Sequence, residues 1–490
     1  MKYLIGVDIG TSGTKTVLFD ECGRVIADKT VEYPMYQPQN GWAEQDPEDW
    51  FAAVRDTLAA VSAALPEGGE VAGIGLSGQM HGLVMLDEAG EVIRPSIIWC
   101  DQRTGAECEE ITARVGAERL IEITANPALT GFTASKILWV RNHEPENYAR
   151  CKHILLPKDY VRYRLTGEFA TEVSDAGGMQ LLDVPNRCWS AEVLEALEID
   201  PALLPRVYES PEITGYVRGL GCLEGVPVVG GAGDNAAAAV GSGAVRAGRA
   251  FTTIGTSGVV FAHTDSPVID PKGRVHTFCC AVPGKWHVMG VTQGAGLSLK
   301  WFRTQFAPEL SYREIDEIAA GVPVGAEKLL YLPYLMGERT PHLDPNARGV
   351  FFGMSAMHEK KHFLRAVLEG VTYSLRDCVE VLREMDIPLT NMTVVGGGGR
   401  SALWREMIAG TFDLPVKTIQ NGEGAALGVA ILAGVGAGVY ESVEEACDRL
   451  IAYNEPQLPT DVAAYEQYYR VYRSVYPGVK ESFAALAEVE

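Results

Sequence analysis

The hydrophobic pattern opens with two apolar segments that enclose a tight turn. Residues Tyr3–Asp8 and Thr14–Asp20 read as strands, with Gly10–Gly13 as the turn between them. The arrangement returns in the second half, where the strand-like Ala250–Ile254 runs into Gly255–Gly258. Both turns read Gly-Thr-Ser-Gly and lie half of the 490 residues apart. This recurrence predicts an internal duplication.

Strand-like and helical segments alternate along the rest of the chain. Asp46 as N-cap, Pro47 at the first helical position and two following acids predict a helix to about Leu65. Further strands are expected at Val71–Leu76, Ile97–Trp99, Val226–Gly230, Val259–His263 and Val394–Val395. Further helices are expected at Ala134–Arg141, Asn235–Val240, His362–Met385, Ala402–Phe412 and about Val462–Glu490. This alternation predicts an α/β fold.

The length favours two large domains. Glycines cluster at residues 241–248, so we expect an N-terminal domain of residues 1–245 and a C-terminal domain of residues 246–490. No low-complexity linker separates the halves, and we expect them to pack across a cleft. The uncharged stretch Gly424–Tyr440 is 17 residues long, short for a membrane span, and predicts a buried helix.

The net charge of −22 argues against nucleic acid or an anionic membrane surface as a partner, because both require a basic face. The ten cysteines contain no Cys-x-x-Cys pair, so reduced thiols and a cytoplasmic location are expected. Asp8 interrupts the first apolar run, which argues against a signal peptide.

The paired turns are candidate phosphate-binding loops. Glycine at both ends lets backbone N–H groups converge on an anion, and the Thr and Ser hydroxyls add donors. Asp8, just before the first turn, is a candidate Mg²⁺ ligand. Ordinary hairpins use the same residue types, but the pair together with the acid favours phosphate binding. The candidate nucleotide-binding residues of the two hairpins are Thr11, Ser12, Lys15, Gly255 and Thr256.

Two other nucleotide motifs are absent or unconvincing. The sequence contains no Gly-x-x-x-x-Gly-Lys-Ser/Thr, which argues against a P-loop NTPase. Residues Gly73–Gly78 fit Gly-x-Gly-x-x-Gly, but two of the glycines fall inside the expected strand and no helix-forming run follows. A dinucleotide site is therefore not expected there.

Asp234 is the candidate general base. It follows the strand Val226–Gly230 and a glycine-rich turn, and it opens a helix. An acid at the carboxyl end of a strand is where α/β proteins place chemistry, and in phosphoryl transfer such an acid accepts the proton of the attacking hydroxyl. An N-cap role is compatible with this one.

Polar groups after two other strands are candidates for binding a sugar. Gln79 and His81 lie in a glycine-flanked turn, and Trp99 and Asp101 follow the next strand. An indole face with polar neighbours suits the apolar C–H face and hydroxyl rim of a sugar. Near the C-terminus, Gly396–Gly399 leaves room for a purine and its ribose beside the backbone.

These segments together resemble the FGGY carbohydrate kinases from end to end, and most closely their xylulose kinases. The stretch at residues 131–143 and the stretches at 349–354 and 363–369 are similar to the two family signatures. Residues 79–82, 156–160, 233–237 and 332–341 are similar to xylulose kinases in particular.

The resemblance implies two actin-like, ribonuclease-H-like domains with a catalytic cleft between them. It implies ATP and Mg²⁺ dependence, transfer of phosphate to D-xylulose, and a homodimer in many members. The residues implied around the sugar are Met80, His81, Asp234 and Asn235, and those implied at the adenosine are Gly397 and Gly398. A kinase for another ketose or polyol such as ribulose, and an ATP-binding protein of the actin/Hsp70 type without kinase activity, stay open as alternatives.

Overall fold

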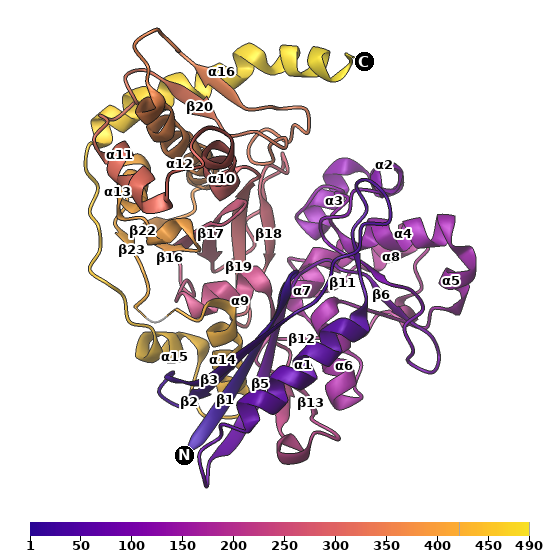
Figure 1. The fold of residues 1–490 in the computed structure, drawn as a ribbon. Helices are drawn as coiled ribbons and strands as arrows, with labels where there is room; N and C mark the ends of the chain where they lie inside the picture. Colours follow the sequence, from indigo (N-terminus) through magenta and orange to yellow (C-terminus); the bar gives the residue numbers. More distant parts are fainter. Residues whose placement is uncertain (421, 490) are drawn as a thin grey trace.

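The computed structural model, which describes residues 1–420 and 422–489, is built around two mixed sheets, one in each half of the chain (Figure 1). The first sheet has the strand order β13 (Ile213–Tyr216), β14 (Pro227–Val229), β5 (Glu70–Gly78), β1 (Lys2–Ile9), β2 (Gly13–Asp20) and β3 (Val25–Glu32), with β15 (Ala232–Gly233) paired to β5. The second has the order β18 (His276–Cys279), β19 (Trp286–Thr292), β17 (Gly258–Thr264), β16 (Gly248–Ile254), β22 (Leu389–Val395) and β23 (Val416–Lys417).

The two sheets share one topology. In the first, β1 pairs antiparallel with β2 and parallel with β5. In the second, β16 pairs antiparallel with β17 and parallel with β22. The third strand of each sheet, β3 or β19, is again antiparallel to its neighbour. This matched pairing confirms the predicted α/β fold with two ribonuclease-H-like sheets, and it places each Gly-Thr-Ser-Gly turn between the first two strands of its own sheet.

Helices surround both sheets. Helix α1 (Pro47–Ser62) begins as predicted, because the Asp46 side chain accepts a hydrogen bond from the Glu48 amide, and it ends three residues before the expected Leu65. The other helices of the first half are α2 (Gly105–Val115), α3 (Ala117–Thr124), α4 (Thr133–His143), α5 (Pro145–Arg150), α6 (Pro157–Thr166), α7 (Val173–Ala176), α8 (Ala191–Leu197) and α9 (Asp234–Gly241). Those of the second half are α10 (Ala295–Phe306), α11 (Tyr312–Ala320), α12 (Lys360–Glu384), α13 (Ala402–Phe412), α14 (Gly424–Gly436), α15 (Val443–Leu450) and α16 (Val462–Ala487).

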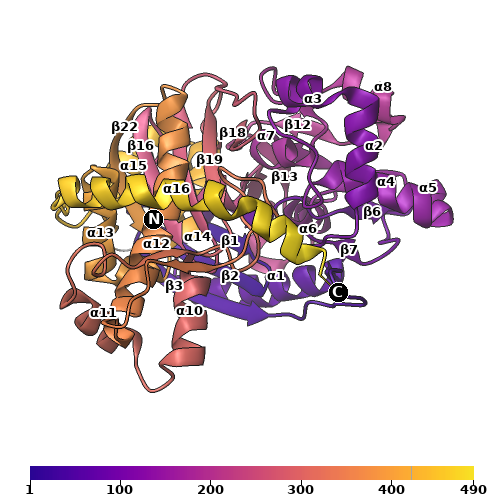
Figure 2. The same cartoon turned by 90° about the horizontal axis from the view of Figure 1, so that it is seen from above.

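The remaining strands form two-stranded pairs that hold the loops around the two sheets. They are β4 (Glu44–Gln45) with β7 (Ser96–Ile97), β6 (Val84–Leu86) with β8 (His153–Leu155), β9 (Ala170–Glu172) with β12 (Arg206–Tyr208), β10 (Leu182–Asp183) with β11 (Cys188–Trp189), and β20 (Leu330–Leu332) with β21 (Val350–Phe352). The last helix, α16, lies across the top of the molecule (Figure 2).

Helix α14 is the buried helix predicted in the apolar stretch, and it packs against the sheet of the other half. It contacts β1, β5 and α9 (Figure 1). A β-carbon on Gly6 or Gly75 would clash with the carbonyl groups of Ala426 or Val429 in α14. The glycines of β5 therefore serve close packing of a helix on a strand, which explains the Gly-x-Gly-x-x-Gly pattern without a dinucleotide.

This contact bears on the domain division. The boundary between residues 245 and 246 stays a prediction, since a helix from the second segment covers a face of the first sheet.

All ten cysteines are free, in agreement with the absence of a disulfide scaffold. Among the described residues, no helix has both the length and the apolar character that crossing a bilayer requires.

Candidate active site

The first Gly-Thr-Ser-Gly turn is tied to the predicted sugar-binding segments. The Thr11 hydroxyl donates to the side-chain oxygen of Gln79 at 3.2 Å, and it accepts a hydrogen bond from the Trp99 indole at 2.9 Å. Gln45 donates to the Thr11 carbonyl at 2.8 Å and accepts from the Gln79 amide at 2.7 Å. Both ends of the Gln79 amide are thus engaged, so this side chain links the turn to the segment that follows β5.

The second turn is held by the first residues of α10. The Gly296 and Leu297 amides donate to the carbonyls of Gly255 and Thr256 at 2.7 and 3.1 Å. The Gly255 amide donates to the Ser257 carbonyl at 3.1 Å, as the Gly10 amide does to the Gly13 carbonyl at 3.0 Å. In both turns the amide of the first glycine donates forward across the turn, but to the third residue in the second turn and to the fourth residue in the first.

Asp234 begins helix α9 with one carboxylate oxygen fixed and the other open. Its Oδ1 accepts from the Asn235 amide at 2.7 Å and from the Asn235 side chain at 3.0 Å. Burial and the nearby Asp8 carboxylate raise the pKa of Asp234 to about 6. Within residues 1–420 and 422–489, Oδ2 accepts no hydrogen bond, so it remains available to take a proton.

Asp8 lies beside this base, at the end of β1. Its Oδ1 accepts from the Ser77 hydroxyl at 2.9 Å, and burial raises its pKa. No group of three or more His, Cys, Asp or Glu suited to holding a metal occurs in the part of the chain that the structure describes. A buried carboxylate beside a candidate phosphate-binding turn suits Mg²⁺, which takes few protein ligands and shares its shell with phosphate oxygens. The residues present therefore fit a metal that arrives with ATP.

His81 is neutral and is held from both sides. Its Nδ1 lies 2.8 Å from the carbonyl oxygen of Gly178, so Nδ1 carries the proton and Nε2 is an acceptor. Burial, with the nearby Lys136, lowers the pKa of His81 to about 3. Its own carbonyl accepts from Lys136 at 2.9 Å and from Thr133 at 3.1 Å. These bonds hold its backbone in the left-handed region, at a φ of 71°.

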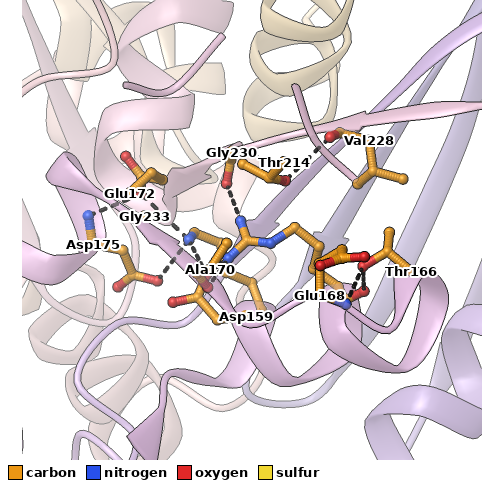
Figure 3. A network of polar contacts seen from close by, with 12 residues as sticks. Asp159, Thr166, Glu168, Ala170, Glu172, Asp175, Thr214, Val228, Gly230 and Gly233 are labelled. Atoms are coloured by element: carbon orange, nitrogen blue, oxygen red, sulfur yellow. Dashed lines mark hydrogen bonds and ion pairs between the residues drawn. The ribbon is translucent and has the colours of Figure 1, made fainter. Parts of the chain in front are cut away.

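A fully buried ionic network lies behind this site (Figure 3). The Lys158 ammonium group is 2.7 Å from Asp159 and 3.3 Å from both Glu172 and Asp175. Arg162 pairs with Asp159 at 2.7 Å. Burial raises the pKa of Asp175 well above its usual value, and the neighbouring acids add to this effect. Two cations, Lys158 and Arg162, thus face three acids.

The network holds the turn that carries Asp234. Arg162 donates to the Gly230 carbonyl at 2.8 Å, at one end of the turn. At the other end, the Gly233 amide donates to the Ser174 hydroxyl at 3.1 Å, and Ser174 donates to Glu172 at 2.9 Å. The position of the candidate base therefore depends on side chains from α6 and from the start of α7.

The other candidate residues differ in their exposure and in the partners that they contact. Asp101 is buried, and its oxygens accept from the Ala43 amide and from Arg103, so this carboxylate presents no free oxygen to a sugar. Trp99 is 43% exposed beside the first turn. Met80 is buried against Gly178 and Gly233. Lys15 pairs with Glu423, which precedes α14.

The adenosine candidates lie near the second turn. Gly397 and Gly398 sit where β22 ends, and a β-carbon on Gly397 would meet no atom within 4 Å. A β-carbon on Gly398 would clash with Ile254, at the end of β16. The segment is therefore open on one side and packed against the second sheet on the other.

Sequence reasoning missed several residues that shape the site. Gln45 gave no signal, because its partners Thr11 and Gln79 are distant in the chain. Lys136 and Lys158 lie inside segments that resemble the family, and this resemblance was the signal that could have identified them. Their contacts with His81 and Glu172 are distant in the sequence, so the sequence alone did not show them.

Comparison with known proteins identifies the family to which this chain belongs. Models of the N-terminal and C-terminal domains of the FGGY family of carbohydrate kinases match residues 3–241 and 250–437. A xylulose kinase of Bacillus subtilis is 40% identical over 99% of both chains. The crystal structure of a xylulose kinase from Brucella ovis superposes with a TM-score of 0.93 at 36% identity, covering 98% of this chain and 99% of that one.

A relative with another substrate in its name is also similar. A gluconokinase of Bacillus subtilis is 32% identical over 97% of this chain and 94% of its own length. Both domain models and the full-length relatives lead to the same conclusion: this chain belongs to the FGGY family of carbohydrate kinases.

Proposed function

We propose that this phosphotransferase moves the γ-phosphoryl group of ATP to O5 of D-xylulose, giving D-xylulose 5-phosphate, with Asp234 as general base. The observation that carries the proposal is the open Oδ2 of Asp234, on a carboxyl group whose pKa of about 6 suits proton transfer near neutral pH. The choice of sugar rests on the xylulose kinases, which are about 40% identical over their full length, against 32% for the gluconokinase.

The reaction needs alignment more than covalent participation by the protein. As O5 forms a bond to the γ-phosphorus, its proton passes to Asp234 and the bond to the ADP oxygen breaks. Asn235 keeps the base in place through its two hydrogen bonds. His81 offers the acceptor Nε2 to a sugar hydroxyl, and Met80 supplies an apolar wall beside it.

The nucleotide is proposed to lie along the two turns, with Thr11, Ser12, Gly255 and Thr256 at the phosphates. Lys15 adds a positive charge, and Gly397 and Gly398 adjoin the adenosine. Asp8 would hold Mg²⁺, which when bound neutralises charge on the phosphate oxygens. By analogy with many members of the family, we also propose a homodimer located in the cytoplasm.

The experiment that tests the substrate is a panel of ketoses, polyols and gluconate in a coupled assay for ADP. The highest kcat/KM is expected for D-xylulose. A higher value for D-ribulose or gluconate would replace the sugar, and sugar-independent ATP binding without phosphorylated product would support an actin-like ATP-binding protein instead.

The role of the base is tested by Asp234→Asn. We expect a loss of about 10²–10⁴-fold in kcat with little change in the binding of either substrate, because general bases contribute about that much. Asp28→Asn, at an exposed position of β3, is the matched control. Near-normal turnover by the Asp234 variant would rule out this role.

A further inference from the structure

Arg339 stands on a rigidly held segment of the second half. The preceding residue, Glu338, is buried and accepts hydrogen bonds from Thr292 at 2.6 Å, the Gln293 amide at 2.9 Å and the Arg339 amide at 2.7 Å. The following residue, Thr340, exchanges hydrogen bonds with the Val291 backbone at 3.0 and 3.1 Å. The backbone of Arg339 is therefore fixed to the end of β19.

Its side chain reaches residues of the first half. A β-carbon on Gly131 would lie 3.8 Å from an Nη atom of Arg339 and 3.1 Å from the carbonyl oxygen of Trp99. Gly131 is also the residue whose carbonyl accepts from Lys136, the side chain that holds His81. The guanidinium group thus lies against the same loops that form the His81 side of the candidate site.

This guanidinium group has no partner among the described residues. It is half-buried, and burial lowers its pKa, yet it remains a cation because guanidinium groups do not deprotonate in proteins. The other arginines near the site, Arg103 and Arg162, are each paired with a carboxylate. A partly desolvated cation with five N–H donors and no acceptor among the described residues is stabilised when a bound ligand supplies acceptor oxygen atoms.

The surroundings indicate which part of the site it faces. Burial lowers the pKa of His81 and of His276, and the Arg339 cation lowers both further. Gly131, beside which the guanidinium group lies, adjoins Phe132, whose ring centroid is 4.6 Å from that of His81 and 5.8 Å from that of His276. The guanidinium group therefore lies on the His81 side of the candidate site.

We propose that Arg339 donates hydrogen bonds to oxygen atoms of the bound sugar at the end remote from the hydroxyl that Asp234 deprotonates. The inference rests on the proposed function. In a 2-ketose that end carries a carbonyl, which can only accept, next to a hydroxyl, which can also donate. Arg339 as donor and Nε2 of His81 as acceptor match this pair. Since the two residues come from opposite halves of the chain, the sugar contacts both.

The test is the kinetics of Arg339→Met and Arg339→Lys, with Arg313→Met on the exposed face of α11 as the matched control. Loss of hydrogen bonds from a charged donor predicts a rise of about 10–100-fold in the KM for sugar in Arg339→Met. Arg339→Lys, which keeps the charge but loses the planar fork, should fall between it and the wild type. The KM for ATP should stay within about twofold, because the nucleotide contacts are elsewhere.

The outcomes separate the inference from the function it rests on. If the wild type does not turn over D-xylulose, the proposed function fails, and the same variants are then measured with the sugar that the panel selects. If the wild type is active and Arg339→Met has an unchanged sugar KM, the inference is wrong. A fall in kcat together with a higher KM for ATP would also overturn it, since the guanidinium group would then serve the phosphates. Unchanged thermal unfolding of the variants shows that they are folded.

Discussion

The buried network behind Asp234 makes Lys158→Met the most informative single substitution. Methionine fills a similar volume without a charge, so the change removes the cation and little packing. Lys158 contacts Asp159, Glu172 and Asp175, and all four side chains are inaccessible to solvent. In the variant, Arg162 remains beside Asp159, but Glu172 and Asp175 lose the only cation that either contacts in the described network.

The expected loss of stability is large. Removing one partner of a buried ion pair costs about 3–5 kcal/mol, because the remaining charge stays uncompensated in a medium of low polarity. Part of the loss is relieved when Asp175, whose pKa is already raised, takes up a proton. We therefore expect about 3–5 kcal/mol at pH 8, and less at pH 5.5. The sign follows because carboxyl groups with a raised pKa in the folded state bind protons more tightly there than in the unfolded chain, so lowering the pH favours the folded variant.

The assay is urea unfolding followed by circular dichroism at both pH values, together with steady-state kinetics. Lys158→Met combined with Asp175→Asn should recover part of the stability, since it removes one of the uncompensated acids. Lys29→Met, on the exposed edge of β3, should stay within about 0.5 kcal/mol of the wild type. Because the network holds both ends of the turn 230–233, kcat should also fall, by up to about 100-fold for a displacement of the base near 1 Å.

Two results would refute this reasoning. If Lys158→Met unfolds at the same urea concentration as the wild type at pH 8, the network is not a stabilising unit. If the variant is destabilised by the same amount at pH 5.5 as at pH 8, the cost does not come from uncompensated carboxylates.

Two further predictions concern the base and the packing of α14. Activity measured as kcat/KM should fall below an apparent pKa of about 6 and leave about one-tenth of the plateau at pH 5, because Asp234 must be unprotonated to act; a profile that stays flat to pH 5 contradicts the assignment. Gly75→Ala should destabilise the fold by about 1–3 kcal/mol in urea unfolding, since its β-carbon would meet the Val429 carbonyl. Gly105→Ala, where a β-carbon meets nothing within 4 Å, is the control, and equal stability of the two variants would show that α14 can move away.

The elements of the fold were predictable where one local signal sufficed. The two Gly-Thr-Ser-Gly turns lie between strands as the alternating pattern indicated, and Asp46 caps α1 as its neighbours indicated. The apolar stretch after Gly424 was correctly identified as a buried helix, but apolarity alone does not say which sheet a helix covers. Its packing on β1 and β5 depends on glycines more than 350 residues earlier in the chain.

The sequence identified individual residues of the candidate site, but it did not predict the hydrogen bonds that these residues make with distant parts of the chain. The sequence placed Asp8 and Asp234 each near the end of a strand, but it did not show that the Asp8 carboxylate lies close enough to raise the pKa of Asp234. Asp101 carried the same local signal as a sugar ligand, yet Arg103 two residues later and the Ala43 amide occupy it. A sequence shows that a carboxylate follows a strand, but hydrogen bonds to distant backbone decide whether it faces a ligand.

The position of α14 has a consequence for how the protein could be divided. Although residues 1–245 look like a complete unit in the sequence, a fragment ending there would expose the face of β1 and β5 that α14 covers, including Gly6 and Gly75, which the α14 backbone approaches closely. The second half, cut free, would carry that apolar helix without its binding surface. The two halves are thus interlocked rather than merely linked, and gene fragments split at the midpoint would have to reassemble before either could be soluble.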